Sequence, residues 1–87
     1  ERRINKLINT LINQICYTAL VYGRINKKLN ISLSNIEIED LVRKTILTAT
    51  NIERIGKNYY IYNHPANIRI TVNANNFRVI TADKLDK

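Results

Sequence analysis

The spacing of hydrophobic residues changes once along this chain, at Ile52. Before that position apolar side chains recur every three or four residues, as on one face of a helix, and after it they alternate with polar ones, as in a half-buried strand. A chain of 87 residues is too short to bury two separate cores. The pattern therefore predicts one α+β domain over residues 1–87, with amino-terminal helices packed on a three- to four-stranded antiparallel sheet.

The amino-terminal half contains a long amphipathic segment. Apolar residues from Ile4 to Leu20 follow helical spacing, which predicts a core-facing helix over residues 2–22 with a break or kink near Tyr17. Gly23 is a position where this helix can be interrupted, and the basic stretch that follows adds a turn or two, so that helical structure extends over residues 2–29. A membrane-surface helix is the alternative, although Asn rather than Lys fills most of the polar face.

A second helix is predicted over residues 35–48. Ser34 and Glu37 form a capping-box pattern, in which each side chain accepts a hydrogen bond from the backbone of the other residue. Apolar residues from Ile38 to Ile46 then follow helical spacing, and the polar run that begins at Thr48 ends the helix.

The carboxyl-terminal half predicts a sheet over residues 52–83. The strand and turn signals indicate, in chain order, strand 53–55, turn 56–58, strand 59–62, loop 63–67, strand 68–73, turn 74–76 and a last strand 77–82. Asn is expected to take left-handed backbone conformations in the last turn. Arg69, Thr71 and Asn73 should share one face of their strand, because successive side chains point to opposite sides.

The chain is strongly basic. Fourteen Lys and Arg residues against seven Asp and Glu give a net charge of +7, which favours a polyanionic partner, above all RNA. Between Arg54 and Ala82 there are four cations and no acid, so we expect a sheet face that carries only positive and neutral groups. The alternatives are that the charge serves solubility, or that a basic fragment docks on an acidic protein.

Several residues are candidate RNA ligands. Tyr60 and Tyr62 fall on one face of their strand, where exposed rings beside arginines can stack on bases, although tyrosine is also a common strand residue. The candidate contacts to RNA are Lys57, Arg54, Arg78, Asn73, Lys84, Lys27 and Lys28.

Cysteine and histidine occur once each. Cys16 has no second cysteine to pair with and no His or Cys cluster beside it, so the sequence predicts no disulfide, no metal site and no cofactor. We expect Cys16 to be a buried thiol on the first helix. His64 lies in the loop beside the sheet, and imidazole suits proton transfer near neutral pH, so it is either a candidate acid or base or an inert loop residue.

Two features bear on where the chain acts. No apolar run is long enough to span a membrane, and the basic start lacks the apolar core of a signal peptide, so we expect no membrane association of the folded domain. The chain begins with Glu1 rather than Met, which favours a fragment cut from a longer protein.

Most of the chain resembles a family of small uncharacterised bacterial proteins. The resemblance lies in three stretches, residues 54–60, 67–73 and 78–82, and reaches back to the segment from Cys16 to Leu29. More remotely, helices followed by an aromatic strand, an Arg-bearing strand and a final Val-Ile-Thr strand resemble the barnase, EndoU, colicin and RelE superfamily of ribonuclease toxins. Members of that superfamily include the carboxyl-terminal toxin domains of contact-dependent inhibition proteins.

The remote resemblance implies a barnase- or RelE-like fold and a toxic, metal-independent endoribonuclease that cleaves tRNA. In such chemistry a base removes the proton of a ribose 2′-hydroxyl, the oxygen attacks the adjacent phosphorus, and an acid protonates the leaving 5′-oxygen. The resemblance implies that Arg69 and Arg78 contact the phosphate and that Thr71 and Thr81 orient the substrate by hydrogen bonds. It implies proton transfer by His64 or Tyr60, with Lys57 as an alternative acid.

The resemblance also implies partners and a location. An acidic immunity or antitoxin protein would neutralise the domain, a translation factor is a further candidate partner, and the domain would act in the bacterial cytoplasm, released from the carboxyl-terminal part of a larger secreted protein. Two other functions stay open. The domain is either a non-catalytic module that binds RNA or a nucleoprotein, or a structural protein that dimerises through its first helix.

Overall fold

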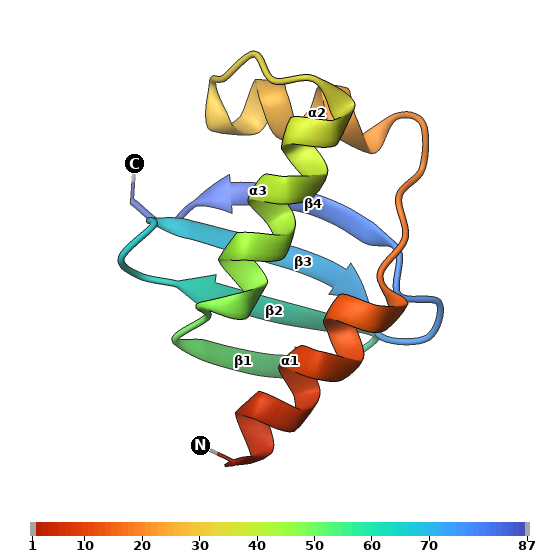
Figure 1. Ribbon diagram of the computed structural model, residues 1–87, viewed down its shortest axis with the longest axis vertical. Helices are drawn as coiled ribbons and strands as arrows, with labels where there is room; N and C mark the ends of the chain where they lie inside the picture. The colour runs from red at the N-terminus through yellow and green to blue at the C-terminus, as the bar shows by residue number, and fades with distance from the viewer. Residues whose placement is uncertain (1, 87) are drawn as a thin grey trace.

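The computed structural model describes residues 2–86, which form three helices followed by a four-stranded antiparallel sheet. The elements are α1 (Arg2–Gln14), α2 (Val21–Leu29), α3 (Asn35–Leu47), β1 (Asn51–Ile55), β2 (Asn58–Asn63), β3 (Ile68–Asn73) and β4 (Val79–Lys84). The strands lie in chain order, and α3 crosses one face of the sheet, with α1 toward β1 and α2 along β4 (Figure 1). The predicted α+β class is confirmed.

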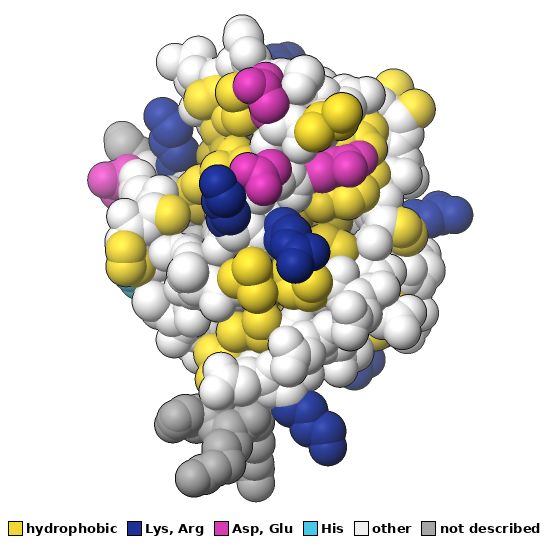
Figure 2. Space-filling model, viewed as in Figure 1, with side chains coloured by type: hydrophobic (Ala, Val, Ile, Leu, Met, Phe, Trp, Pro, Cys, Tyr) yellow, Lys and Arg dark blue, Asp and Glu magenta, His cyan; other side chains and the backbone are white. Residues whose placement is uncertain are grey.

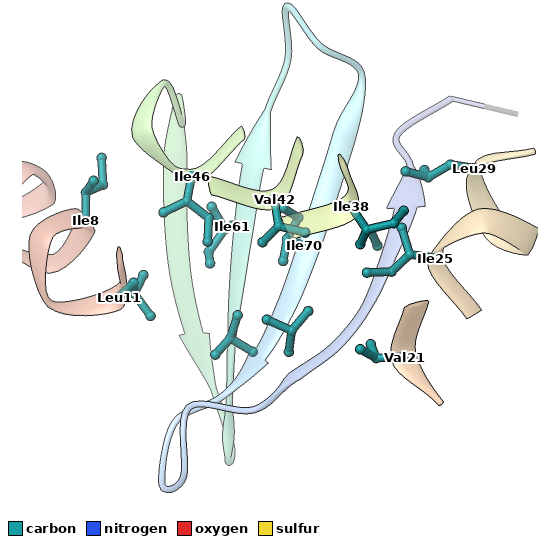
Figure 3. Close-up of a cluster of buried hydrophobic side chains, with 13 residues drawn as sticks. Ile8, Leu11, Val21, Ile25, Leu29, Ile38, Val42, Ile46, Ile61 and Ile70 are labelled. Carbon is teal, nitrogen blue, oxygen red and sulfur yellow. The ribbon is translucent and has the colours of Figure 1, made fainter. Parts of the chain in front are cut away.

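The hydrophobic core lies between α3 and the sheet (Figure 3). Ile38, Val42 and Ile46 form a fully buried stripe on α3, because residues three or four positions apart share one helix face. They pack above Ile61 and Ile70 of the two central strands. The helix thereby shields one face of the sheet from water.

The chain leaves helical structure between α1 and α2, so the helix predicted over residues 2–22 is interrupted at residues 15–20, around the break expected near Tyr17. The Cys16 backbone N–H donates to the Phe77 carbonyl at 2.9 Å, and the Val79 N–H donates to the Cys16 carbonyl at 2.9 Å. This pairing satisfies backbone groups in a β-branched and aromatic stretch of weak helix propensity. It also leaves Cys16 exposed in an extended segment, which corrects the prediction of a buried helical thiol.

Two further predictions for this region are corrected. Leu20, expected on the apolar face of the helix, precedes α2 and is 83% exposed. Gly23 does not interrupt a helix but lies inside α2, whose buried side consists of Val21, Ile25 and Leu29.

The start of α3 is as predicted. The Glu37 N–H donates to Ser34 Oγ at 3.2 Å, and the Ser34 N–H donates to Glu37 Oε1 at 2.9 Å, so the capping box is complete. The helix runs from Asn35 to Leu47.

The last strand begins at Val79, two residues later than predicted. Asn73 Oδ1 accepts hydrogen bonds from the N–H groups of Asn75 and Asn76, and Phe77 then takes a positive φ of 59°. The left-handed residue of this turn is therefore Phe77 rather than an asparagine, because the side chain of Asn73 already sets the course of the two residues before it.

Two tyrosines join the α1–α2 connection to α2 and α3. The rings of Tyr17 and Tyr22 stack with centroids 5.6 Å apart, and the Tyr22 hydroxyl donates to Glu39 Oε2 at 2.6 Å. Burial, with a smaller effect of the Glu39 charge, raises the pKa of Tyr17 to about 12. The neutral phenol is thus favoured in the folded state.

This pKa shift predicts a loss of stability at high pH. An unfolded tyrosine ionises near pH 10, so between about pH 10 and pH 12 the unfolded state binds fewer protons than the folded state and becomes relatively more stable. Urea unfolding at a series of pH values should show the free energy of unfolding falling across this window. Tyr17→Phe should reduce the slope, and an unchanged slope in that variant would contradict the assignment.

Candidate nucleic-acid interface

One face of the sheet is turned away from the helices, and we call it the open face. Ile61 and Ile70 point into the core, so the residues on either side of them point outward. The predicted sharing of one face by Arg69, Thr71 and Asn73 agrees with the register of β3 against β2. The open face consists of Asn51, Glu53 and Ile55 of β1, Asn58, Tyr60 and Tyr62 of β2, Arg69, Thr71 and Asn73 of β3, and Thr81 and Asp83 of β4.

Three candidate catalytic residues form a row across the middle of the open face. Tyr60 pairs with Thr71, which in turn pairs with Thr81 on the next strand. Thr71 is only 5% exposed, and the Thr81 hydroxyl is buried without a hydrogen-bond partner among the described residues. The hydroxyl groups of the two threonines are therefore recessed in the open face. A phosphate that approaches the sheet would contact Tyr60 before either of them.

Arg69 is the one cation among the open-face residues named above. Its Cζ lies 5.5 Å from the centroid of the Tyr60 ring, and its Nη2 lies 3.5 Å from Asp83 Oδ2. The other carboxylate oxygen of Asp83 is 3.4 Å from Nζ of Lys28, which reaches over from α2. One carboxylate thus positions two cations, and the group of three carries a net positive charge.

The open face is not free of acids, which corrects the expectation from the sequence. The acid-free stretch covers residues 54–82, but its two flanking acids fall on the same face. Glu53 pairs opposite Tyr60, and Asp83 pairs opposite Arg69. Antiparallel pairing brings both ends of the stretch alongside its middle, which a count along the sequence does not reveal.

Further cations border the open face beside β4, and we call them the α2 flank. It consists of Arg24, Lys27, Lys28, Arg78 and Lys84, all exposed. Arg24 and Arg78 line one hollow between α2 and β4, and Lys28 and Lys84 line another together with Arg69. Arg24 belongs to the same short basic stretch as the candidates Lys27 and Lys28, and all three lie outside the buried stripe of α2.

Other candidates lie outside the central group. Arg54 faces the helix side of the sheet, with its Cζ 5.6 Å from the Tyr59 ring centroid. Lys57 lies in the β1–β2 turn, and the side chain of Asn73 holds the β3–β4 turn, as described above. Arg78 comes directly before Val79, which pairs with Val72 of β3. Val72 lies three residues, or about 10 Å, along β3 from Arg69. The two arginines assigned to one phosphate are therefore apart.

His64 lies at the β1 side of the open face. Its ring stacks on Tyr62 with centroids 6.2 Å apart, and its Nδ1 is 2.6 Å from Thr50 Oγ1. The Thr50 hydroxyl also lies 3.1 Å from the Tyr62 carbonyl. When the hydroxyl donates to that carbonyl, Nδ1 carries the imidazole proton and Nε2 is the basic nitrogen.

Glu53 completes this end of the face. The Tyr62 hydroxyl donates to Glu53 Oε1 at 3.4 Å, so Tyr62 lies between a carboxylate and an imidazole. The sequence suggested no paired Glu and His, because 10 residues of sequence separate Glu53 from His64. The β1–β2 hairpin brings them to the same tyrosine.

Within residues 2–86 no group of three or more His, Cys, Asp or Glu side chains is arranged to hold a metal ion. In the same part of the chain no helix is both long enough and apolar enough to cross a membrane.

Comparison with known proteins gives one match. A family model described as "Protein of unknown function (DUF3781)" matches residues 9–83. No curated protein and no solved structure matches the chain. The resemblance to ribonuclease toxins therefore stays a prediction.

Proposed function

Because the chain belongs to the DUF3781 family, whose description assigns no function, we propose from the geometry alone that it is a single-stranded RNA-binding domain. The RNA lies across the open face, and the α2 flank contacts its phosphates. The observation that carries this proposal is the position of Arg69, beside two tyrosines on the face of the sheet that the described helices leave uncovered.

The tyrosines supply a surface for bases. Tyr60 and Tyr62 are two residues apart on one strand face, so their rings follow one another along the strand at about 7 Å. Aromatic rings at such spacing can stack on successive bases of an extended strand, and each stacked base contributes about 1–3 kcal/mol. A duplex hides the faces of its bases, so this surface favours a single strand.

The cations supply the attraction to the phosphates. Arg69 and Lys28 share one acidic partner, and the remaining members of the α2 flank have no ion pair within the described residues. Each cation that neutralises a phosphate releases a counterion, so binding should weaken as salt is added. The α2 flank continues the open face around the β4 edge. The sugar-phosphate backbone of an RNA strand bound on the open face would pass over it.

Cleavage of the bound RNA is a second candidate function, favoured by the contacts at Tyr62. His64 with a basic Nε2, or the carboxylate of Glu53, would take the proton of a 2′-hydroxyl, whose oxygen attacks the neighbouring phosphorus. The other group, protonated, would donate to the leaving 5′-oxygen. Arg69, paired with Tyr62 across the strands, would stabilise the added charge on the phosphorus. Toxicity and neutralisation by an immunity protein belong to this candidate and stay predictions.

Binding is tested by fluorescence anisotropy with a labelled single-stranded RNA of about 12 nucleotides, in EDTA, at several salt concentrations. Arg69→Gln should weaken binding about tenfold and reduce the salt slope by about one, because one charged contact is lost. Arg43→Gln is the matched control, since Arg43 is exposed on α3 on the other side of the molecule. Equal losses in both variants would contradict an interface on the open face.

The same RNA, run on a denaturing gel, tests cleavage. Discrete fragments from the unchanged protein that disappear in His64→Gln would support the second candidate. Bound but intact RNA would support the binding function without cleavage. Absence of both binding and cleavage would overturn the proposal. Single-stranded DNA of the same sequence shows whether the 2′-hydroxyl contributes.

A further inference from the structure

A second surface lies on the helix side of the molecule, and we call it the α3 groove. It is a hollow lined by Leu33, Ile36, Glu37, Asp40, Leu41 and Lys44. Ile36 is 79% exposed although it lies in the first turn of α3. Leu33 and Leu41 also line a neighbouring apolar hollow at the carboxyl-terminal end of α2, so the apolar surface continues past the groove.

The lining of the α3 groove contains two carboxylates, Glu37 and Asp40, against one cation, Lys44, so its net charge is opposite to that of the whole protein. Of the seven acidic residues in this chain of net charge +7, three fall within four positions of α3, namely Glu37, Glu39 and Asp40. Figure 2 shows acidic side chains grouped on this face among hydrophobic ones.

These carboxylates are held in place before any partner arrives. Glu37 accepts from the Ser34 N–H, Glu39 accepts from the Tyr22 hydroxyl, and Asp40 lies 3.1 Å from Nζ of Lys44. Each carboxylate oxygen can accept a further hydrogen bond. Of the three, Glu37 and Asp40 line the groove, whereas Glu39 is turned to Tyr22 of α2. Acceptors that are already fixed lose little conformational entropy when a cation binds.

We propose that the α3 groove binds a cationic amphipathic helix of a partner protein. Apolar side chains of that helix would fill the hollow around Leu33 and Leu41 and cover Ile36, and flanking Lys or Arg residues would contact the carboxylates of Glu37 and Asp40. RNA and anionic lipid surfaces carry the wrong charge for this face. The proposal does not depend on RNA binding, because the groove lies on the helix side of the sheet and the open face on the other.

The probe is a synthetic helical peptide of about 14 residues made of Leu and Lys, titrated into the isotope-labelled domain. Backbone amide shifts should concentrate at residues 31–44. A peptide of the same pattern with Glu in place of Lys should bind at least tenfold more weakly, because it faces the carboxylates with like charge.

Two variants locate the binding site. Ile36→Ser should weaken binding about tenfold through lost apolar burial, whereas Ile55→Ser, which changes a 58% exposed isoleucine on the open face, should leave it unchanged. Both positions are exposed, so neither change should unfold the domain. Equal binding of the Lys and Glu peptides, shifts confined to the sheet, or no binding at millimolar peptide would overturn the proposal.

Discussion

Replacing Ile70 with alanine is expected to lower the free energy of unfolding by about 2–5 kcal/mol. Ile70 is 1% exposed in β3, an inner strand of the sheet, and packs with Ile61 and the buried stripe of α3. Removing its outer carbons leaves a cavity that strands on both sides cannot close. Small domains are typically stable by only about 5–15 kcal/mol, so the variant should unfold at much lower urea concentration.

Ile55→Ala is the matched control for this prediction. It removes the same atoms from a side chain that is 58% exposed at the end of β1, and it should cost less than about 1 kcal/mol. Urea unfolding followed by circular dichroism measures both variants. Similar losses in the two would mean that Ile70 does not lie in the core described above.

Replacing Tyr60 and Tyr62 together with alanine is expected to weaken single-stranded RNA binding by at least about thirtyfold. Each ring can contribute about 1–3 kcal/mol by stacking on a base, and the two contributions should largely add if the rings hold different bases. Tyr60 also lies against the guanidinium of Arg69, so its loss frees that cation from a defined position. Anisotropy with the labelled RNA measures the change.

The double replacement by phenylalanine is the control, because phenylalanine keeps both rings and removes only the hydroxyl groups. It should bind RNA within about threefold of the unchanged protein. If the alanine and phenylalanine variants bind equally well, the tyrosines are ordinary strand residues and the RNA lies elsewhere. Loss of cleavage with retained binding in the phenylalanine variant would instead assign a catalytic task to a hydroxyl.

Local features of the chain were predictable where the interactions that produce them are local. The capping box that starts α3 joins residues three positions apart, and it forms as the pattern indicates. The alternation of residues 68–73 likewise determines that Arg69 and Thr71 share a face, because the period of a strand is a property of its own backbone.

The break after α1 was not predictable in its extent. Residues 15–20 keep apolar residues at helical spacing, yet the backbone of Cys16 pairs with Phe77 and Val79, more than 60 residues further along. A local pattern cannot report a hydrogen-bond partner at such a distance. The exposed position of Cys16 follows from the same pairing.

The sequence by itself determined the α+β class, the excess of positive charge and the set of side chains that each strand presents on either face. Only the tertiary structure decided which of those sets meet: Arg69 with Asp83 and Lys28, and Tyr62 with Glu53 and His64. The physical reason is that periodicity arises within one element, whereas the register between strands and the position of a helix beside them depend on how the core packs.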